Sequence, residues 1–332
     1  MTILRKKMTN FAFDIKYKKE FFEIMINRTL IRIKIVQLIY SFYQNGGKDI
    51  ATAEKELIFS LSKAYDLYNF LLQLIIDVTK YADEQLQDLI ELNKITHNNE
   101  VVSTKFVDNR FVKQLAENHQ LNEFNADHKR TWMNDIDYLK KLLEQIQKSE
   151  TYVNYMNSDD DSYDADKELW RKIYKSIIMK DVDIDDVLED KSLYWNDDKE
   201  IVDTFVLKTI KKFDPNNKDK QELIPEYKDE NDREFAIKLF RSTIINDETY
   251  RRLIEQNVRN WEFDRLAFMD VVIMQIAIAE IMGFDLIPTK VSINEYVDIA
   301  RYYSTPKSPA YVNGILDTVV KKLKRERLII KD

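Results

Sequence analysis

Helix-breaking residues are scarce in this chain, and their scarcity limits the folds open to it. Only four glycines and five prolines occur in 332 residues, and no proline precedes Pro215. A sheet protein with many tight turns needs more glycine than this, whereas long helices need little of either residue. Apolar residues make up 44% of the sequence, which is ample for a core. The sequence therefore predicts an all-α protein with one large domain or two modest ones.

The first helix is predicted from Asn27 to Gln44. Its apolar residues recur at steps of three and four, which gives one seam: Ile31, Ile35, Leu38 and Phe42. The alternation of isoleucines at 31, 33 and 35 is also typical of a strand, but the helical period continues for about four turns. Arg28 and Arg32 are four residues apart and are expected on one face beside the seam.

The middle of the chain shows further helical patterns and no convincing internal repeat. Residues 53–93 keep a period near 3.5 and predict one long helix or two helices with a bend. The polar, proline-containing residues 214–229 are the clearest linker. The run that starts at Asp181 resembles the beginning of an EF-hand loop, but Asp186 and Ser192 stand where that loop needs glycine and glutamate. An acidic turn or a helix N-terminus is the better interpretation.

Three helical patterns follow one another between residues 266 and 323, each with readable ends. Gly283 is expected in the left-handed conformation that closes the first of them. Ser292 and Glu295 have capping-box spacing and predict the start of the second. Ser308-Pro309 is typical of an N-cap followed by the first helical residue, and predicts the start of the third.

Motifs in these helices resemble the transcription antitermination factor NusB family. INEYVDIAR at 293–301 and YVNGILD at 311–317 are similar to the family's "INEAIELAK" and "FVNGVLD", and RLAFMDVVIMQIAIAE at 265–280 is similar to its "RL" helix. VQLIYSFYQ at 36–44 matches the family's "qaLY" motif. The resemblance covers about residues 25–45 and 230–325.

The resemblance implies an all-α, NusB-like helical bundle with an enlarged N-terminal half. We expect an extension at 1–24, an N-terminal helical part at 25–228 with a large insert at about 50–215, and a C-terminal NusB-like domain at 229–332. The extension is either part of the protein or the product of an upstream start codon. No role for the insert is implied.

The family's function implies a cytoplasmic, non-enzymatic factor that acts in transcription antitermination. It would bind single-stranded boxA RNA of ribosomal RNA leaders together with the ribosomal protein NusE, and join NusA, NusG and RNA polymerase. The alternative is a helical interaction scaffold of NusB fold that has lost RNA binding.

Site residues follow from the same resemblance. Arg28, Arg32 and Lys34 are the expected RNA contacts, through phosphate neutralisation and guanidinium stacking on unpaired bases. Tyr40, Glu280 and Tyr311 are the expected contacts to the protein partner. For these side chains, ordinary surface pairing, capping and packing are the competing interpretations.

Composition narrows the remaining function classes. Cysteine is absent, which excludes disulfides and thiolate chemistry, and the three histidines are too scattered to suggest a metal site. Glycine-rich nucleotide loops are absent, so no cofactor is expected. No stretch approaches the roughly 20 apolar residues that a membrane helix needs. The net charge of −7 argues against indiscriminate nucleic-acid coating, although residues 1–50 hold 10 Lys/Arg against 4 Asp/Glu.

Overall fold

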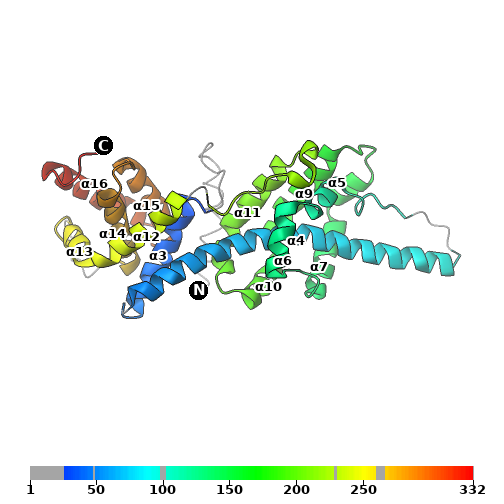
Figure 1. Cartoon of the computed structure of the whole chain (residues 1–332), viewed down its shortest axis with the longest axis horizontal. Coiled ribbons are helices and arrows are strands. Elements are labelled where there is room, and N and C mark those ends of the chain that lie inside the picture. Colours follow the sequence, from blue (N-terminus) through cyan, green and yellow to red (C-terminus); the bar gives the residue numbers. More distant parts are fainter. Residues whose placement is uncertain (1–25, 48, 98–101, 228–229, 259–265, 332) are drawn as a thin grey trace. The chain divides into compact units, whose positions relative to one another are not determined.

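The computed structural model describes residues 26–47, 49–97, 102–227, 230–258 and 266–331 (Figure 1). Within these ranges every regular element is a helix, so the all-α prediction is confirmed. The expected extension at 1–24 lies outside the described residues. None of the helices in these ranges is long and apolar enough to cross a membrane.

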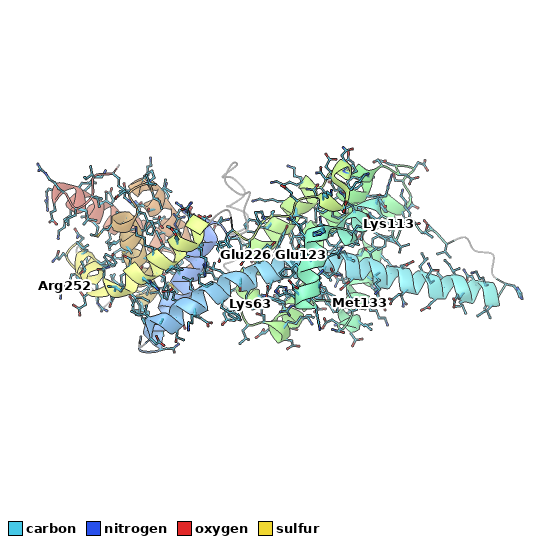
Figure 2. The ribbon with its side chains drawn as sticks, in the orientation of Figure 1. Lys63, Lys113, Glu123, Met133, Glu226 and Arg252 are labelled. Carbon is cyan, nitrogen blue, oxygen red and sulfur yellow. The ribbon has the colours of Figure 1, made fainter. Side chains whose placement is uncertain are left out.

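The chain divides into two compact units, and the division differs from the expected one. Unit 1 combines residues up to Ser62 with residues from Glu226 onward, and unit 2 is Lys63–Pro225. Lys63 and Glu226 are labelled in Figure 2. The first helix therefore belongs with the C-terminal helices rather than with an N-terminal part that ends at 228. The expected insert at about 50–215 overlaps unit 2, and its status as an insert stays a prediction.

Unit 1 is a helical bundle in which α14 packs against α3, α12, α13, α15 and α16 (Figure 1). α14 is apolar on nearly all sides, which is the pattern of a helix that is surrounded by others. In α14 every residue from Asp270 to Ile281 is buried. The helices of this unit are α3 (Arg28–Gln44), α12 (Glu230–Ile245), α13 (Asp247–Glu255), α14 (Phe268–Gly283), α15 (Thr289–Tyr303) and α16 (Ser308–Arg325).

The ends of these helices test the caps expected from the sequence. Asn27 caps α3, because its side chain accepts a hydrogen bond from the backbone N–H of Leu30 at 2.9 Å. The prediction for Gly283 was wrong, since α14 ends there without a positive φ. The prediction for Ser292 was also wrong, because α15 already begins at Thr289 and Ser292 is buried inside it. Ser308 is the first residue of α16 rather than its N-cap.

Unit 2 packs short helices against part of a long one. α4 (Ile50–Ile95) is one continuous helix of 46 residues, which settles the choice between one helix and two. It belongs to unit 1 up to Ser62 and to unit 2 from Lys63. The other helices are α5 (Arg110–Ala116), α6 (His119–His128), α7 (Ile136–Lys148), α8 (Glu150–Met156), α9 (Tyr163–Ser176), α10 (Asp183–Lys191) and α11 (Trp195–Lys212), with 3-10 turns η2 (Ile178–Lys180) and η3 (Pro215–Lys220).

Large aromatic residues fill the interior of unit 2. Phe70 and Trp132 stack with ring centroids 4.2 Å apart, and Trp195 lies 5.3 Å from Phe70. The indole N–H of Trp132 donates to the carbonyl oxygen of Phe70 at 2.7 Å, so the polar edge of the buried ring is satisfied. The acidic run after Asp181 forms the first turn of α10, where carboxylates favour the helix dipole.

Candidate nucleic-acid and protein interfaces

Arg28 opens α3 with its guanidinium at the surface. The side chain is 43% exposed, and its Nε donates to Asp232 on α12 at 3.2 Å. The guanidinium carbon lies 4.9 Å from the centroid of the Phe235 ring. The guanidinium therefore lies over an aromatic ring, while part of the side chain faces solvent. A cation held in this way is suited to stacking and to phosphate contact.

Arg32, one turn further along α3, points into the bundle instead. It forms a bidentate ion pair with Glu280 of α14, with Nε–Oε2 at 2.7 Å and Nη2–Oε1 at 2.8 Å. Burial acts to lower the pKa of Arg32, but the charge of Glu280 outweighs it, so the pKa is raised. The two charged residues are 248 positions apart in the sequence. Their buried ion pair joins α3 to α14.

The Glu280 carboxylate is satisfied entirely from inside the bundle. Besides the two bonds from Arg32, it accepts from Ser292 Oγ at 2.7 Å and from Tyr296 Oη at 3.0 Å, both on α15. Burial and the charge of Glu280 raise the pKa of Tyr296, which therefore stays a donor. Arg32 also reaches Glu295 of α15 at 3.4 Å. This network joins three helices and leaves Glu280 no exposure to solvent.

The three cations predicted to contact RNA are thus not displayed together. Lys34 is buried like Arg32, and Arg28 is the member of the three that reaches solvent. Arg28 and Arg32 do share one face of α3, as expected, because both lie against the Phe235 ring. The ring centroid is 4.9 Å from the Arg28 guanidinium carbon and 5.6 Å from that of Arg32. That face is partly internal, since Phe235 is itself buried. The RNA-contact role of these residues stays a prediction.

A group of aromatic side chains gathers where the C-terminal part of α3 meets the start of α14. The Phe268 ring lies 5.3 Å from Tyr40 and 6.4 Å from Tyr43. Phe268 is 38% exposed. The hydroxyl of Tyr43 donates to Asp247 at 3.2 Å, which fixes that side of the group. Together these side chains form a partly apolar surface.

Asp270 lies in the first turn of α14 and has one carboxylate oxygen without a partner. Its Oδ2 accepts from Ser308 Oγ of α16 at 2.8 Å, while Oδ1 has no hydrogen-bond partner among the described residues. The Tyr311 hydroxyl also lacks a partner in that part of the chain, and burial together with the charge of Asp270 raises the pKa of Tyr311. Two buried polar atoms without partners are costly and suggest an external ligand for this place.

The structure therefore brings Tyr40, Phe268, Asp270 and Tyr311 to the helices that meet around the start of α14, and it separates Glu280 from them. Phe268 and Asp270 were not predicted from the sequence. The available signal was the aspartate within the otherwise apolar run FMDVVIMQ, since a carboxylate in the middle of an apolar helix needs a reason. Glu280 is also a carboxylate within this apolar helix. Only the hydrogen-bond partners in the folded structure distinguish Glu280 from Asp270.

Unit 2 holds its own buried polar network. Lys199 of α11 pairs with Asp203 at 2.8 Å, and Asp203 also accepts from Tyr174 of α9 at 2.7 Å. Burial raises the pKa of Asp203. Burial and the charge of Asp203 raise the pKa of Glu200 to about 7. No group of three or more His, Cys, Asp or Glu side chains in the described residues is arranged to hold a metal ion.

Comparisons with known proteins agree on one family. The NusB family model matches residues 202–321. A transcription antitermination protein NusB from Salinibacter ruber is 38% identical over 97 residues, 29% of this chain and 61% of that protein. The relative from Natranaerobius thermophilus is 50% identical over 74 residues, 22% of this chain and 53% of that protein. The relative from Finegoldia magna is 37% identical over 92 residues, 28% of this chain and 67% of that protein. The chain spans about half to two thirds of the length of the relatives it matches.

Proposed function

The chain belongs to the NusB family, and on that premise we propose that it is a transcription antitermination factor. Its relatives carry the name transcription antitermination protein. In this proposal the chain binds boxA RNA together with the ribosomal protein NusE, and joins NusA, NusG and RNA polymerase in the cytoplasm. It acts by binding alone and carries out no chemical step.

The observation that carries the RNA part of the proposal is the pose of Arg28. Its guanidinium rests on Phe235 and is oriented by Asp232, so little side-chain entropy is lost when a base or phosphate arrives. Arginine is suited to both contacts, because it stacks through its plane and donates through its edge.

Arg32 and Glu280 take a different role in this proposal from the one expected from the sequence. Their ion pair holds α3 against α14 and α15 and so positions the first turn that carries Arg28. Because both guanidiniums border Phe235, a disturbed Arg32 would also disturb the ring under Arg28. Lys34 is buried and is assigned no RNA contact.

The surface around Phe268 is the proposed contact for the protein partner. It retains Tyr40 and Tyr311 from the sequence prediction and replaces Glu280 with Asp270. Phe268 supplies an exposed ring, and Asp270 and Tyr311 supply a carboxylate oxygen and a hydroxyl without hydrogen-bond partners among the described residues. Aromatic anchors surrounded by polar groups are typical of binding hot spots. A cationic or hydrogen-bond-donating group of the partner would satisfy Asp270.

The test of the RNA contact is boxA RNA binding by the heterodimer at several salt concentrations. Arg28→Ala should weaken binding and reduce the magnitude of the log–log salt slope by about 0.7, the contribution of one phosphate contact on a single strand. Arg252→Ala is the matched control, because Arg252 is an exposed arginine of α13 that pairs with Glu248 at 3.1 Å (Figure 2). Equal binding by the two variants would remove Arg28 from the RNA site.

The test of the partner contact is co-purification with NusE. Phe268→Ala should reduce the retained ribosomal protein, whereas Phe59→Ala, which removes an exposed ring of α4, should not. The alternative function, a scaffold without RNA binding, is favoured by the burial of Arg32 and Lys34. It would be supported if the wild-type heterodimer forms but fails to retain boxA RNA.

A further inference from the structure

A second cationic surface lies next to Arg28 and is assembled from the α12 helix, the loop after α14 and the C-terminal tail. The ring of Phe284, just past the end of α14, lies 4.8 Å from the ring of Phe235. Lys238 of α12 places its ammonium 4.7 Å from the centroid of the Phe284 ring. Lys331 in the C-terminal tail reaches the same residue. Phe235 is thus shared between Arg28 and this second surface.

Both ammonium groups are held on backbone carbonyls at the end of α14. Lys238 Nζ donates to Gly283 O at 2.8 Å, and Lys331 Nζ donates to Phe284 O at 2.6 Å. Cations at a helix C-terminus commonly cap the last carbonyls, and capping alone would account for these two bonds. An ammonium has three donors, however, so further donors remain on each group for a ligand.

Among the described residues, Lys238 and Lys331 differ from several cations of the same unit in having backbone carbonyls, and no carboxylate, as hydrogen-bond partners. Arg28, Arg241 and Arg252 each make an ion pair with a carboxylate. Within the described ranges, Lys238 and Lys331 make none, although Asp285 lies on the adjoining loop. Partial burial lowers the pKa of Lys331 and outweighs the charges of Glu280 and Asp285, which act to raise it. An anion at this place would therefore offset the remaining cost of burying the charge.

Large apolar side chains stand out to solvent beside these cations. Leu286 follows Phe284 in the loop and is 97% exposed, and Ile330 precedes Lys331 and is also 97% exposed. A single exposed apolar residue needs no explanation, but here two of them lie close in sequence to a partly exposed ring and to a lysine of the same surface. Aromatic and apolar faces between cations are the composition of surfaces that bind single strands.

We propose that Lys238, Phe284 and Lys331 form a second contact for single-stranded RNA near Arg28, with the buried ring of Phe235 packed between the Phe284 ring and the Arg28 guanidinium. This inference rests on the proposed RNA-binding function and adds the direction in which the strand leaves Arg28. The two ammonium groups contact successive phosphates, and the base between them packs on Phe284 and Leu286. The surface reads the backbone and the face of a base, so it contributes affinity with little sequence preference.

The experiment measures binding of fluorescently labelled boxA RNA to the full chain, with and without NusE. Lys238→Ala and Lys331→Ala should each lower the magnitude of the salt slope by about 0.7 and together weaken binding about tenfold or more at moderate salt. Asp285→Asn should strengthen binding, since it removes the nearby negative charge. Lys321→Ala is the control, because Lys321 is exposed on α16 and paired with Asp317 at 2.6 Å, and this variant should bind like the wild type.

A second variant tests the aromatic part of the contact without changing charge. Phe284→Leu should weaken binding about fivefold or more, by loss of base stacking, and leave the salt slope unchanged. Unchanged affinity and slope in both the double lysine variant and Phe284→Leu would overturn the inference while leaving the Arg28 contact intact. Loss of binding to vesicles of anionic phospholipid by the lysine variants, with RNA binding unaffected, would also overturn it and assign the surface to lipid. Absence of RNA binding by the wild type would instead refute the proposed function itself.

Discussion

The two units bury charge in the same way but present opposite charge to their surroundings. Unit 1 contains 28 Lys/Arg against 24 Asp/Glu, and unit 2 contains 23 against 34. Each hides a tightly bonded ion pair, Arg32–Glu280 in unit 1 and Lys199–Asp203 in unit 2. The net charge of −7 is therefore an average over a basic unit and a strongly acidic one, and it gives little information about RNA binding by unit 1.

Aromatic residues sharpen the contrast. In unit 2 the rings of Trp132 and Trp195 are fully buried and both contact the buried Phe70 ring. In unit 1, Phe268 and Phe284 reach the surface beside polar or cationic groups. Rings in the interior stabilise a fold, whereas partly exposed rings beside charge are suited to ligands. This contrast supports the proposal that RNA contact lies in unit 1.

The largest expected effect is on unit 1. Arg32→Ala leaves the Glu280 carboxylate buried without its cation, and breaking a buried pair in this way costs about 3–5 kcal/mol. Hydrogen exchange should show loss of protection in α3, α14 and α15, with α7, α9 and α11 unchanged. Equal loss of protection in unit 2 would show that the two units unfold together and would break the comparison.

The matching change in unit 2 should cost less. Lys199→Ala leaves Asp203 buried, but burial already raises the pKa of Asp203, so the carboxyl can take up a proton and become neutral. We expect a loss of about 2 kcal/mol near neutral pH, becoming smaller as the pH is lowered, measured by hydrogen exchange of α9 and α11. Asp203→Asn with Lys199→Ala together should recover part of the loss. A pH-independent loss would contradict this account.

Glu200 gives unit 2 a pH dependence of intermediate size. Its folded pKa of about 7 lies above the ordinary value, so the folded state binds more protons than the unfolded state between the two values. Stability should therefore be greatest below about pH 4.5 for this group and should fall as the pH rises towards 7. Because Glu200 is partly exposed, the expected change is only about 1 kcal/mol. Glu200→Gln should abolish it in denaturant titrations of unit 2 at pH 5 and pH 8.

The smallest expected effects concern two exposed residues with positive φ, one in each unit. Lys129 closes α6 with φ 48°, and Arg327 follows α16 with φ 57°. Glycine adopts this conformation without the steric cost of a Cβ, so Lys129→Gly and Arg327→Gly should each stabilise their unit by about 0.5 kcal/mol. Thermal unfolding should detect the gain, and the Lys129→Ala and Arg327→Ala variants, which keep a Cβ, should not show it.

Local features of the sequence were sufficient for much of the fold. The apolar seam correctly predicted α3, because the helical period acts over a few residues. The unbroken helical pattern after residue 53 was compatible with the single helix α4, one of the two alternatives predicted there. The three C-terminal helices occur in the predicted order. The predictions for Gly283 and Ser292 also used local motifs, and both were wrong. Ser292 is drawn into α15 as a donor to Glu280, a residue of another helix.

The sequence by itself determined that the chain is helical and that it belongs to the NusB family, because helical period and motif order are written in neighbouring residues. Only the tertiary structure decided which charged residues are available for binding. Arg28 and Arg32 are the same residue type, one turn apart on the same helix. Yet the first reaches solvent beside Phe235, and the second forms a buried ion pair with Glu280. A partner 248 residues away determines that difference, and burial depends on such distant contacts rather than on the residues alongside.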